Sequence, residues 1–327
     1  MIRETEEAKE QASDSTAQTL GSLIERWLEL GGPAAPSTRL VYAGYIKNQI
    51  KPYLWDMPLD RLKVADMDRW YAVLREKGLR PASIRKAHTI VRAALSQGVR
   101  WGWIPVNVAD MAKPPVVPKP VIAMPKPADV KRLVAFIADF DQEFALYVRL
   151  SGVTGARPGE VCALQWEDID FLSGHMHVRR RVMRSDKGMF TEDLTKTGKV
   201  RRVPLDSSTL RWLRDHRAMC QARAEQVGVQ LLPDAYVFAS SPDGRDFWRP
   251  DAVTRWFRSF RENAAMGAVP MYSLRHQAAT TMIDAGVDPK TASDRLGNSV
   301  ATILSTYTRG RTEADVKAAN MLGKLYD

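Results

Sequence analysis

The stretch Tyr272–Tyr307, YSLRHQAATTMIDAGVDPKTASDRLGNSVATILSTY, decides the fold of the C-terminal half and is typical of short helices joined by tight turns. Ser273 is a favourable N-cap residue and predicts the start of a first helix, which should end before Gly286. A second helix should begin after Asp288, because an N-cap aspartate followed by proline favours helix initiation, and should end before Gly297. The glycines therefore divide the stretch into separate helical segments.

An arginine and a tyrosine hold defined positions in this stretch. A third helix should follow Ser299 and carry Tyr307 near its end, ten residues after Gly297, while Arg275 lies near the start of the first helix. A guanidinium donates two parallel, charge-assisted hydrogen bonds and stays protonated, so it suits a phosphate. A tyrosine hydroxyl becomes a nucleophile when it loses its proton. An arginine early in the stretch, a Leu-Gly turn and a tyrosine ten residues after that glycine form a rare arrangement.

Two further segments precede this stretch, TGARPGEVCALQWEDID at Thr154–Asp170 and TKTGKVRRVPL at Thr195–Leu205. Each segment alone is a weak signal, since short Arg-x-x-Glu or Lys-Thr patterns are common in proteins. In this order, and followed by a tyrosine at the right spacing, they resemble the motifs of the tyrosine recombinases, the phage integrase family. The resemblance covers residues 18–327.

The resemblance implies a role for each of four residues. Arg157 and Arg275 would clamp the scissile phosphate, Lys196 on a mobile turn would protonate the leaving 5′-oxygen, and Tyr307 would attack the phosphorus. Two arginines would supply most of the electrostatic stabilisation of the charged transition state, and the lysine would act as general acid. The implied 3′-phosphotyrosine conserves the bond energy, so rejoining needs no ATP, metal or other cofactor.

The sequence departs from the family's pattern at its two histidine positions. Tyr272 stands three residues before Arg275, and Asn298 follows the Leu-Gly turn. His276 does not compensate, because residues i and i+1 point to different helix faces. Asn298 retains an N–H donor for a phosphate oxygen, whereas Tyr272 can donate its hydroxyl but is a poor base near neutral pH. Because losing one such donor typically lowers the rate about 10²–10³-fold, we expect slower catalysis rather than none.

The composition is that of a globular protein with an anionic partner. The chain has 327 residues, 45% of them hydrophobic, and a formal net charge of +10, which favours binding to nucleic acid. Its only cysteines, Cys162 and Cys220, predict no disulfide framework and are compatible with a reducing cytoplasm. No apolar run approaches a membrane span. These features predict a cytoplasmic protein, and the resemblance implies that it is nucleoid-associated in a bacterial host.

The predicted fold is mainly α with a small β-sheet (α+β). We expect a polar tail at 1–17, a helical core-binding bundle at 18–112 and a Pro/Lys-rich linker at 113–127. A mixed α/β catalytic domain should follow at 128–310. The last segment, 311–327, has an apolar stripe at helical spacing, and the resemblance implies that it docks on a neighbouring protomer.

Amphipathic periodicity in the N-terminal half predicts helices at 19–31, 64–77 and 81–98, with a further helix capped by Ser37 or Thr38 and running to Ile50. Their polar sides carry basic residues, a pattern that is equally compatible with an ordinary solvent-exposed helix face. Beside a recombinase catalytic domain, these helices resemble one half of a DNA clamp. The predicted DNA-binding residues are Arg39, Lys47, Arg85, Lys86, Arg92, Lys119, Arg179 and Arg181.

In the catalytic half we expect Asp129 to cap a helix and Glu160 to brace Arg157. A strand should cover 175–182, and Phe190–Thr195 should pair with Val200–Leu205 in a hairpin that carries Lys196. The strand places two histidines on one face, but no further ligands stand at suitable spacing. We therefore predict no metal site.

The expected partner is double-stranded DNA at attachment or core sites, on which the protein should assemble as a tetramer. The resemblance also admits a host DNA-bending or directionality factor. Two alternatives remain: a catalytically attenuated, architectural DNA-binding protein of the same fold, and a strand-swivelling topoisomerase. The retained Arg157, Lys196, Arg275 and Tyr307 favour the recombinase over the architectural protein.

Overall fold

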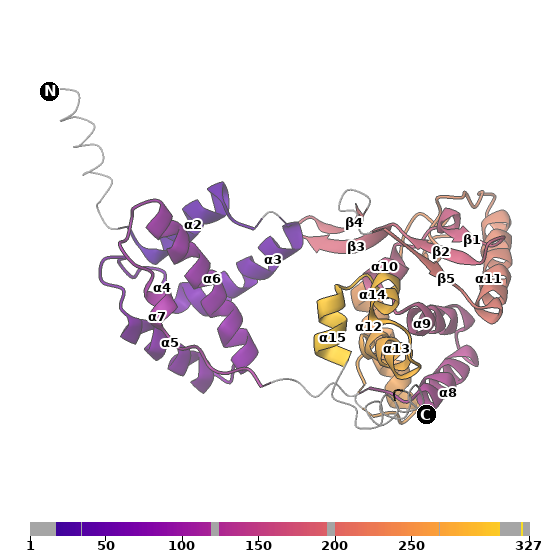
Figure 1. Ribbon diagram of the computed structural model, residues 1–327. Coiled ribbons are helices and arrows are strands. Elements are labelled where there is room, and N and C mark those ends of the chain that lie inside the picture. The colour runs from indigo at the N-terminus through magenta and orange to yellow at the C-terminus, as the bar shows by residue number, and fades with distance from the viewer. Residues whose placement is uncertain are drawn as a thin grey trace. The chain divides into compact units, whose positions relative to one another are not determined.

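The computed structural model in Figure 1 describes residues 18–33, 35–118, 124–194, 200–267, 269–307 and 322, without the side chains of 306 and 307. The chain divides into two compact units: Met1–Pro120 with Arg184–Gly188, and Val121–Met183 with Met189–Asp327. Each unit has its own hydrophobic core. The predicted tail at 1–17 lies outside the described residues, as does the tail at 311–327 apart from Leu322.

The first unit is helical. Leu20, Leu23 and Ile24 are buried on one face of α2, where they belong to the same core as Trp70 of α5 and Ile90 of α6. The elements are α2 (Leu20–Leu30), α3 (Pro36–Tyr45), the π-helix η1 (Ile46–Ile50), α4 (Lys51–Leu54), α5 (Val64–Glu76), α6 (Pro81–Arg100) and α7 (Val108–Met111).

The second predicted helix differs in the structure at both ends. Ala35 is its N-cap and Pro36 its first residue, so the expected cap at Ser37 or Thr38 is wrong. Proline fits the first helical position because its missing N–H would have no partner there. Toward Ile50 the α-helix widens into a π-turn. The following Pro52 explains the change, since it cannot donate to the preceding turn and its ring crowds that turn's carbonyl.

The second unit combines helices with short strands. Its helices are α8 (Pro127–Ala138), α9 (Gln142–Thr154), α10 (Pro158–Cys162), the 3₁₀ turn η2 (Trp166–Asp168), α11 (Ser207–Gln226), α12 (Pro250–Asn263), α13 (Ser273–Asp284), α14 (Pro289–Leu296) and α15 (Val300–Tyr307). Its strands are β1 (Ile169–Asp170), β2 (His175–Val178), β3 (Arg180–Ser185), β4 (Gly188–Asp193) and β5 (Arg201–Pro204), except that the end of β3 and the start of β4, Arg184–Gly188, are assigned to the first unit. The predicted class, mainly α with a small sheet, is confirmed.

Most helix boundaries of the C-terminal stretch follow their local signals. Asp288 caps α14 by accepting from the backbone N–H groups of Lys290 and Thr291, and Gly297 ends the helix in the left-handed conformation. The expected cap at Ser273 is wrong, because Tyr272 is the N-cap of α13 and the Ser273 hydroxyl donates instead to the carbonyl oxygen of Pro270.

Asp129 is likewise not a cap. Lys126 is the N-cap of α8 and a proline follows it, which places Asp129 within the first turn. A carboxylate there still interacts favourably with the helix dipole, and its Oδ1 accepts from Arg132 at 2.7 Å.

The strands pair differently from the prediction. One sheet has the order β1-β2-β5, with Met176 opposite Val203, and the other pairs β3 with β4. The expected hairpin between Phe190–Thr195 and Val200–Leu205 is therefore wrong. Strand β4 joins β3 through a tight turn that ends at Gly188, whose φ of 115° favours glycine. A short loop closes at little entropic cost, so the local pairing is preferred.

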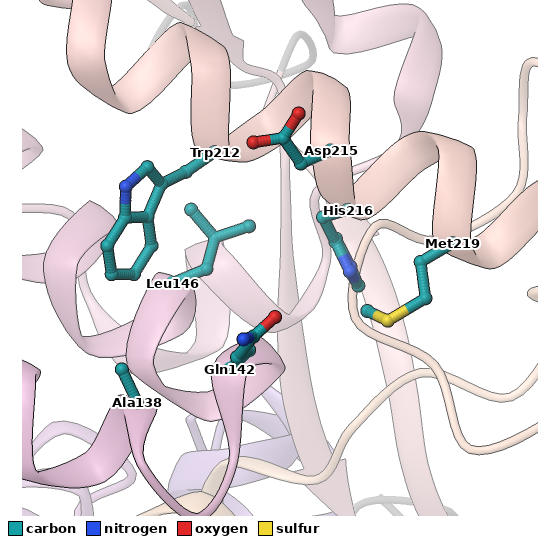
Figure 2. A pocket seen from close by; sticks show the side chains of 7 residues that line it. All are labelled: Ala138, Gln142, Leu146, Trp212, Asp215, His216 and Met219. Carbon is teal, nitrogen blue, oxygen red and sulfur yellow. The ribbon is translucent and has the colours of Figure 1, made fainter.

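Helices α8, α9 and α11 surround a small cavity of about 270 Å³, shown in Figure 2. Trp212 and Leu146 form its apolar part, and His216 and Met219 project from α11. His216 is 4% exposed, and its Nε2 lies 2.7 Å from the carbonyl oxygen of Val237, so this nitrogen carries the proton. Burial lowers the pKa of His216 below its ordinary value, although the nearby Glu143 carboxylate acts in the opposite direction.

We expect the second unit to lose stability as the pH falls below 6.5, the ordinary pKa of histidine. Below that pH the unfolded chain binds a proton that the folded protein still excludes, so the free energy of unfolding falls by at most about 1.4 kcal/mol per pH unit for this group. Urea unfolding over a pH series measures the slope. His216→Gln, which keeps an N–H donor but does not titrate, should flatten it, and an unchanged slope would contradict the assignment.

Candidate active site

The predicted clamp residues lie where helices of the second unit meet. Arg157 is the N-cap of α10, and Gly155 just before it ends α9 with φ 63°. Arg275 stands in the first turn of α13, and Asn298 follows Gly297 at the end of α14. In Figure 1, α13, α14 and α15 lie together, and α13 packs against α9. Residues far apart in the sequence thus converge on one place.

Gly155 is required for this convergence. A Cβ atom at this position would lie 2.3 Å from Cδ2 of Leu296, and its positive φ is unfavourable for other residues. Its carbonyl oxygen accepts a hydrogen bond of 2.6 Å from Nη1 of Arg275. The turn before Arg157 therefore also holds Arg275, the second arginine of the predicted clamp.

Both arginines donate to the same atom. The Oδ1 of Asn298 accepts from Nη2 of Arg275 at 2.6 Å and from Nη2 of Arg157 at 3.1 Å. Because a guanidinium can only donate, the amide oxygen faces the arginines and the amide nitrogen is directed away from them. The oxygen of Asn298 thus occupies a position suited to an anion.

Arg275 is almost completely buried, with 2% of its surface exposed. Burial, followed by the neighbouring charge of Arg157, lowers the pKa of Arg275 to about 10. The guanidinium nevertheless remains protonated at neutral pH. Because Arg275 is buried beside a second cation, Arg157, the pair is suited to bind an anion that accepts a hydrogen bond from each guanidinium.

Glu160 braces Arg157 as predicted. Its Oε1 accepts from Nη1 of Arg157 at 2.9 Å, and its Oε2 accepts from the backbone N–H of the same residue at 2.8 Å. Glu160 is 5% exposed. Burial alone raises its pKa, but hydrogen bonds and charge from Arg201 and Arg157 lower the pKa of Glu160 below its ordinary value. The group therefore stays a carboxylate that orients the clamp.

Arg201 is the residue that the sequence interpretation missed. It forms a bidentate pair with Glu160, from Nη2 to Oε2 at 2.5 Å and from Nη1 to Oε1 at 3.2 Å. Strand alternation was the available signal, because it places Arg201 on the same side of β5 as the buried Val203. An arginine on the inner side of a strand needs a buried carboxylate as partner.

Tyr272, at one of the family's histidine positions, is 44% exposed. Its ring packs edge-on against His276, with the ring centroids 5.1 Å apart. Burial, followed by the charge of Arg275, lowers the pKa of His276. His276 therefore remains neutral near pH 7 and supports the ring of Tyr272.

A cavity of about 1060 Å³ opens beside the clamp. Arg157, Arg201 and Asn298 line it, and so do Leu194 and Val200, which flank the segment that carries the predicted lysine. Lys196 itself lies outside the described residues. The backbone of Tyr307 ends α15, as expected, but its side chain also lies outside them. The structure therefore locates the two arginines and not the predicted acid or nucleophile.

Several of the predicted DNA-binding residues already have partners. Arg92, Arg179 and Arg181 form ion pairs with Asp110, Asp168 and Glu192, respectively. Arg85 donates to the carbonyl oxygen of Pro115, Arg39 donates to that of Pro33, and the Lys86 ammonium lies over the ring of Tyr42. Lys47 is exposed, and Lys119 lies outside the described residues. The role of these residues in DNA binding stays a prediction.

Within the described ranges, no group of three or more His, Cys, Asp or Glu side chains is arranged to hold a metal ion. His175 contacts Ser173 and Arg202 through its Nδ1. None of the helices described is both long and apolar enough to cross a membrane.

The sequence model of the Phage integrase family matches residues 126–313, more than half of the chain, and that of the phage integrase N-terminal SAM-like domain matches residues 19–74. A "Tyrosine recombinase XerC-like" protein of Caldanaerobacter subterraneus subsp. tengcongensis is 26% identical over 341 residues, which cover 94% of this chain and 83% of the relative. The ICEBs1 integrase of Bacillus subtilis is 23% identical over 264 residues, which cover 80% of this chain and 71% of the relative.

Solved structures agree in fold. The Tn1549 transposon integrase in complex with transposon right end DNA has a TM-score of 0.77 at 18% identity, covering 94% of this chain and 100% of that one. A lambda integrase dimer bound to a COC′ core site has a TM-score of 0.68 at 18% identity, covering 93% of this chain and 81% of that one. With both family models matched in order and the two arginines of the predicted clamp brought together, this chain belongs to the phage integrase family, the tyrosine recombinases.

Proposed function

We propose that this chain is the integrase of a phage or other mobile element, a site-specific recombinase that cuts and rejoins DNA through a 3′-phosphotyrosine. The observation that carries the proposal is the convergence of Arg157 and Arg275 on Oδ1 of Asn298, at 3.1 and 2.6 Å. A phosphate oxygen in that position would receive two charge-assisted hydrogen bonds in a protein-lined site, where they are stronger than in water.

The proposed reaction starts when the scissile phosphate replaces the Asn298 oxygen between the arginines. The Tyr307 oxygen then attacks phosphorus as its hydroxyl proton passes to solvent water, and the bond from phosphorus to the 5′-oxygen breaks. Lys196 gives a proton to that oxygen, which departs as a hydroxyl group. Arg157 and Arg275 stabilise the charge that develops on the non-bridging oxygens. Reversal with a new 5′-hydroxyl rejoins the strand.

The proposed partner is double-stranded DNA, on which four copies assemble. A lambda integrase tetramer has been solved on a Holliday junction, and its fold is shared by this chain, which supports the same assembly here. The segment 311–327 would link the protomers, and a host DNA-bending or directionality factor would act on the assembled complex. An architectural protein without activity would have no need for two arginines on one acceptor, so the recombinase is favoured.

Covalent capture tests the proposal. The full chain is incubated with a pool of nicked duplexes of randomised sequence, in which the short strand after cleavage diffuses away and traps the intermediate. We expect a protein–DNA adduct that resists denaturation, with a sequence motif enriched among the captured duplexes. Mass spectrometry of the adduct should locate the DNA on Tyr307. Absence of any adduct, or adducts without an enriched motif, would contradict site-specific recombination.

A further inference from the structure

Arg201 connects three separate parts of the second unit. Its side chain is 8% exposed and forms the bidentate pair with Glu160 on α10. Its Nε donates to the carbonyl oxygen of Arg295, in the last turn of α14, at 3.0 Å. Because Arg201 itself lies on β5, one guanidinium joins this strand to α10, which begins after Arg157, and to α14, which is followed by Asn298.

A second arginine, Arg295 on α14, also connects α14 to β5. Nη2 of Arg295 donates back to the carbonyl oxygen of Pro204 on β5 at 3.2 Å and to that of Val153 on α9 at 3.0 Å. Gly297 lets the strand arginine approach, since a Cβ atom there would lie 3.1 Å from Nη1 of Arg201. The end of α14, and with it Asn298, is therefore positioned by side chains rather than by sheet hydrogen bonds.

The contact with Glu160 bears directly on Arg157. Each carboxylate oxygen of Glu160 accepts one hydrogen bond from Arg157 and one from Arg201. If Arg201 were absent, half of these bonds would be lost and a carboxylate that is 5% exposed would keep a single partner. It could then turn toward Arg157 and draw its guanidinium away from the phosphate position.

We infer that Arg201 is a positioning residue of the clamp: it holds Glu160 and the end of α14 so that Arg157 and Asn298 face the scissile phosphate. The inference rests on the proposed function. Arg201 need not touch DNA to act in this way. The planar guanidinium is suited to this role better than an ammonium group, because lysine cannot bind both carboxylate oxygens and donate to the Arg295 carbonyl in the same fixed geometry.

The test measures the single-turnover rate of adduct formation in the wild-type protein, Arg201→Met and Arg201→Lys. The substrate is the nicked duplex that the wild-type protein selects, at saturating concentration. We expect about a 100-fold lower rate in Arg201→Met, as for a catalytic group displaced by roughly 1 Å. Arg201→Lys should recover part of the rate, and DNA affinity should change far less than the rate. Arg201→Met leaves the buried carboxylate of Glu160 with one partner and can therefore destabilise the fold. The double variant Glu160→Gln/Arg201→Met removes that buried charge, so it serves as a second variant if Arg201→Met alone does not fold.

Arg180→Met is the matched control. Arg180 also pairs with a buried carboxylate, with Nη1 2.7 Å from Oδ2 of Asp168, but it does not line the cavity beside the clamp. A merely structural role predicts that Arg180→Met and Arg201→Met lose stability and rate alike. Positioning predicts that only Arg201→Met loses rate at temperatures where both proteins are folded. Equal rates in the two variants would overturn the inference while leaving the recombinase proposal intact.

A measurement without DNA separates the two proposals further. We expect inorganic phosphate, compared with chloride at equal ionic strength, to raise the thermal stability of the wild-type protein through the clamp. The shift should be lost in Arg157→Met and reduced in Arg201→Met, but kept in Arg180→Met. If Arg201→Met or the double variant keeps the full phosphate shift, Arg201 does not position the clamp, whether or not the protein forms an adduct with DNA.

Discussion

Replacing Tyr307 with phenylalanine is expected to abolish the covalent protein–DNA adduct. The substitution removes only the hydroxyl oxygen that would attack phosphorus, so no nucleophile remains. DNA affinity should stay within about twofold of wild type, because binding rests mainly on phosphate contacts of basic residues. Denaturing gels measure the adduct, and titration at fixed salt measures the affinity.

A second tyrosine provides the control for this prediction. Tyr272 stands near the clamp at the N-cap of α13 and is 44% exposed, so it is the other candidate for attachment. Tyr272→Phe should still form the adduct, more slowly if its hydroxyl donates to the phosphate. An adduct that persists in Tyr307→Phe and disappears in Tyr272→Phe would reverse the assignment of the nucleophile.

Replacing Asn298 with aspartate is expected to stabilise the protein and to suppress DNA cleavage. The two side chains have nearly the same shape, so a carboxylate oxygen would take the place of Oδ1 between Arg157 and Arg275, where the present distances are 3.1 and 2.6 Å. Hydrogen bonds between charged groups contribute about 1.5–3 kcal/mol each. The new anion would have to be displaced by phosphate, and the amide N–H donor would be lost as well. We expect at least about a 10³-fold lower rate of adduct formation.

Two other variants separate the charge from the donor. Asn298→Ala removes the amide without adding charge and should lower the rate by only about 10²-fold. Asn298→His restores the N–H donor typical of the family and should equal or exceed the wild-type rate. Single-turnover cleavage at saturating DNA ranks the variants, and thermal unfolding should find Asn298→Asp the most stable. Equal rates for Asn298→Asp and Asn298→Ala would mean that Asn298 does not lie in the phosphate position.

The sequence by itself determined the local features and singled out the two arginines of the predicted clamp. The cap at Asp288, the stop at Gly297 and the helix that ends at Tyr307 depend on signals that act within one helical turn. Arg157 and Arg275 could be singled out because their motifs surround them closely in the chain. The brace by Glu160 was also predictable, because it lies three residues from Arg157.

Only the tertiary structure decided which distant residues meet. It pairs β4 with β3 and β5 with β2, joins Arg201 to a carboxylate 41 residues away, and turns the oxygen of Asn298 toward an arginine 141 residues away. Burial requires that an inward-facing charge has a partner, but it does not specify which one. That choice depends on how α10 and β5 pack in the main core of the second unit and on how α14 packs in the smaller cluster that it forms with α13 and α15, and no local pattern of residues encodes this packing.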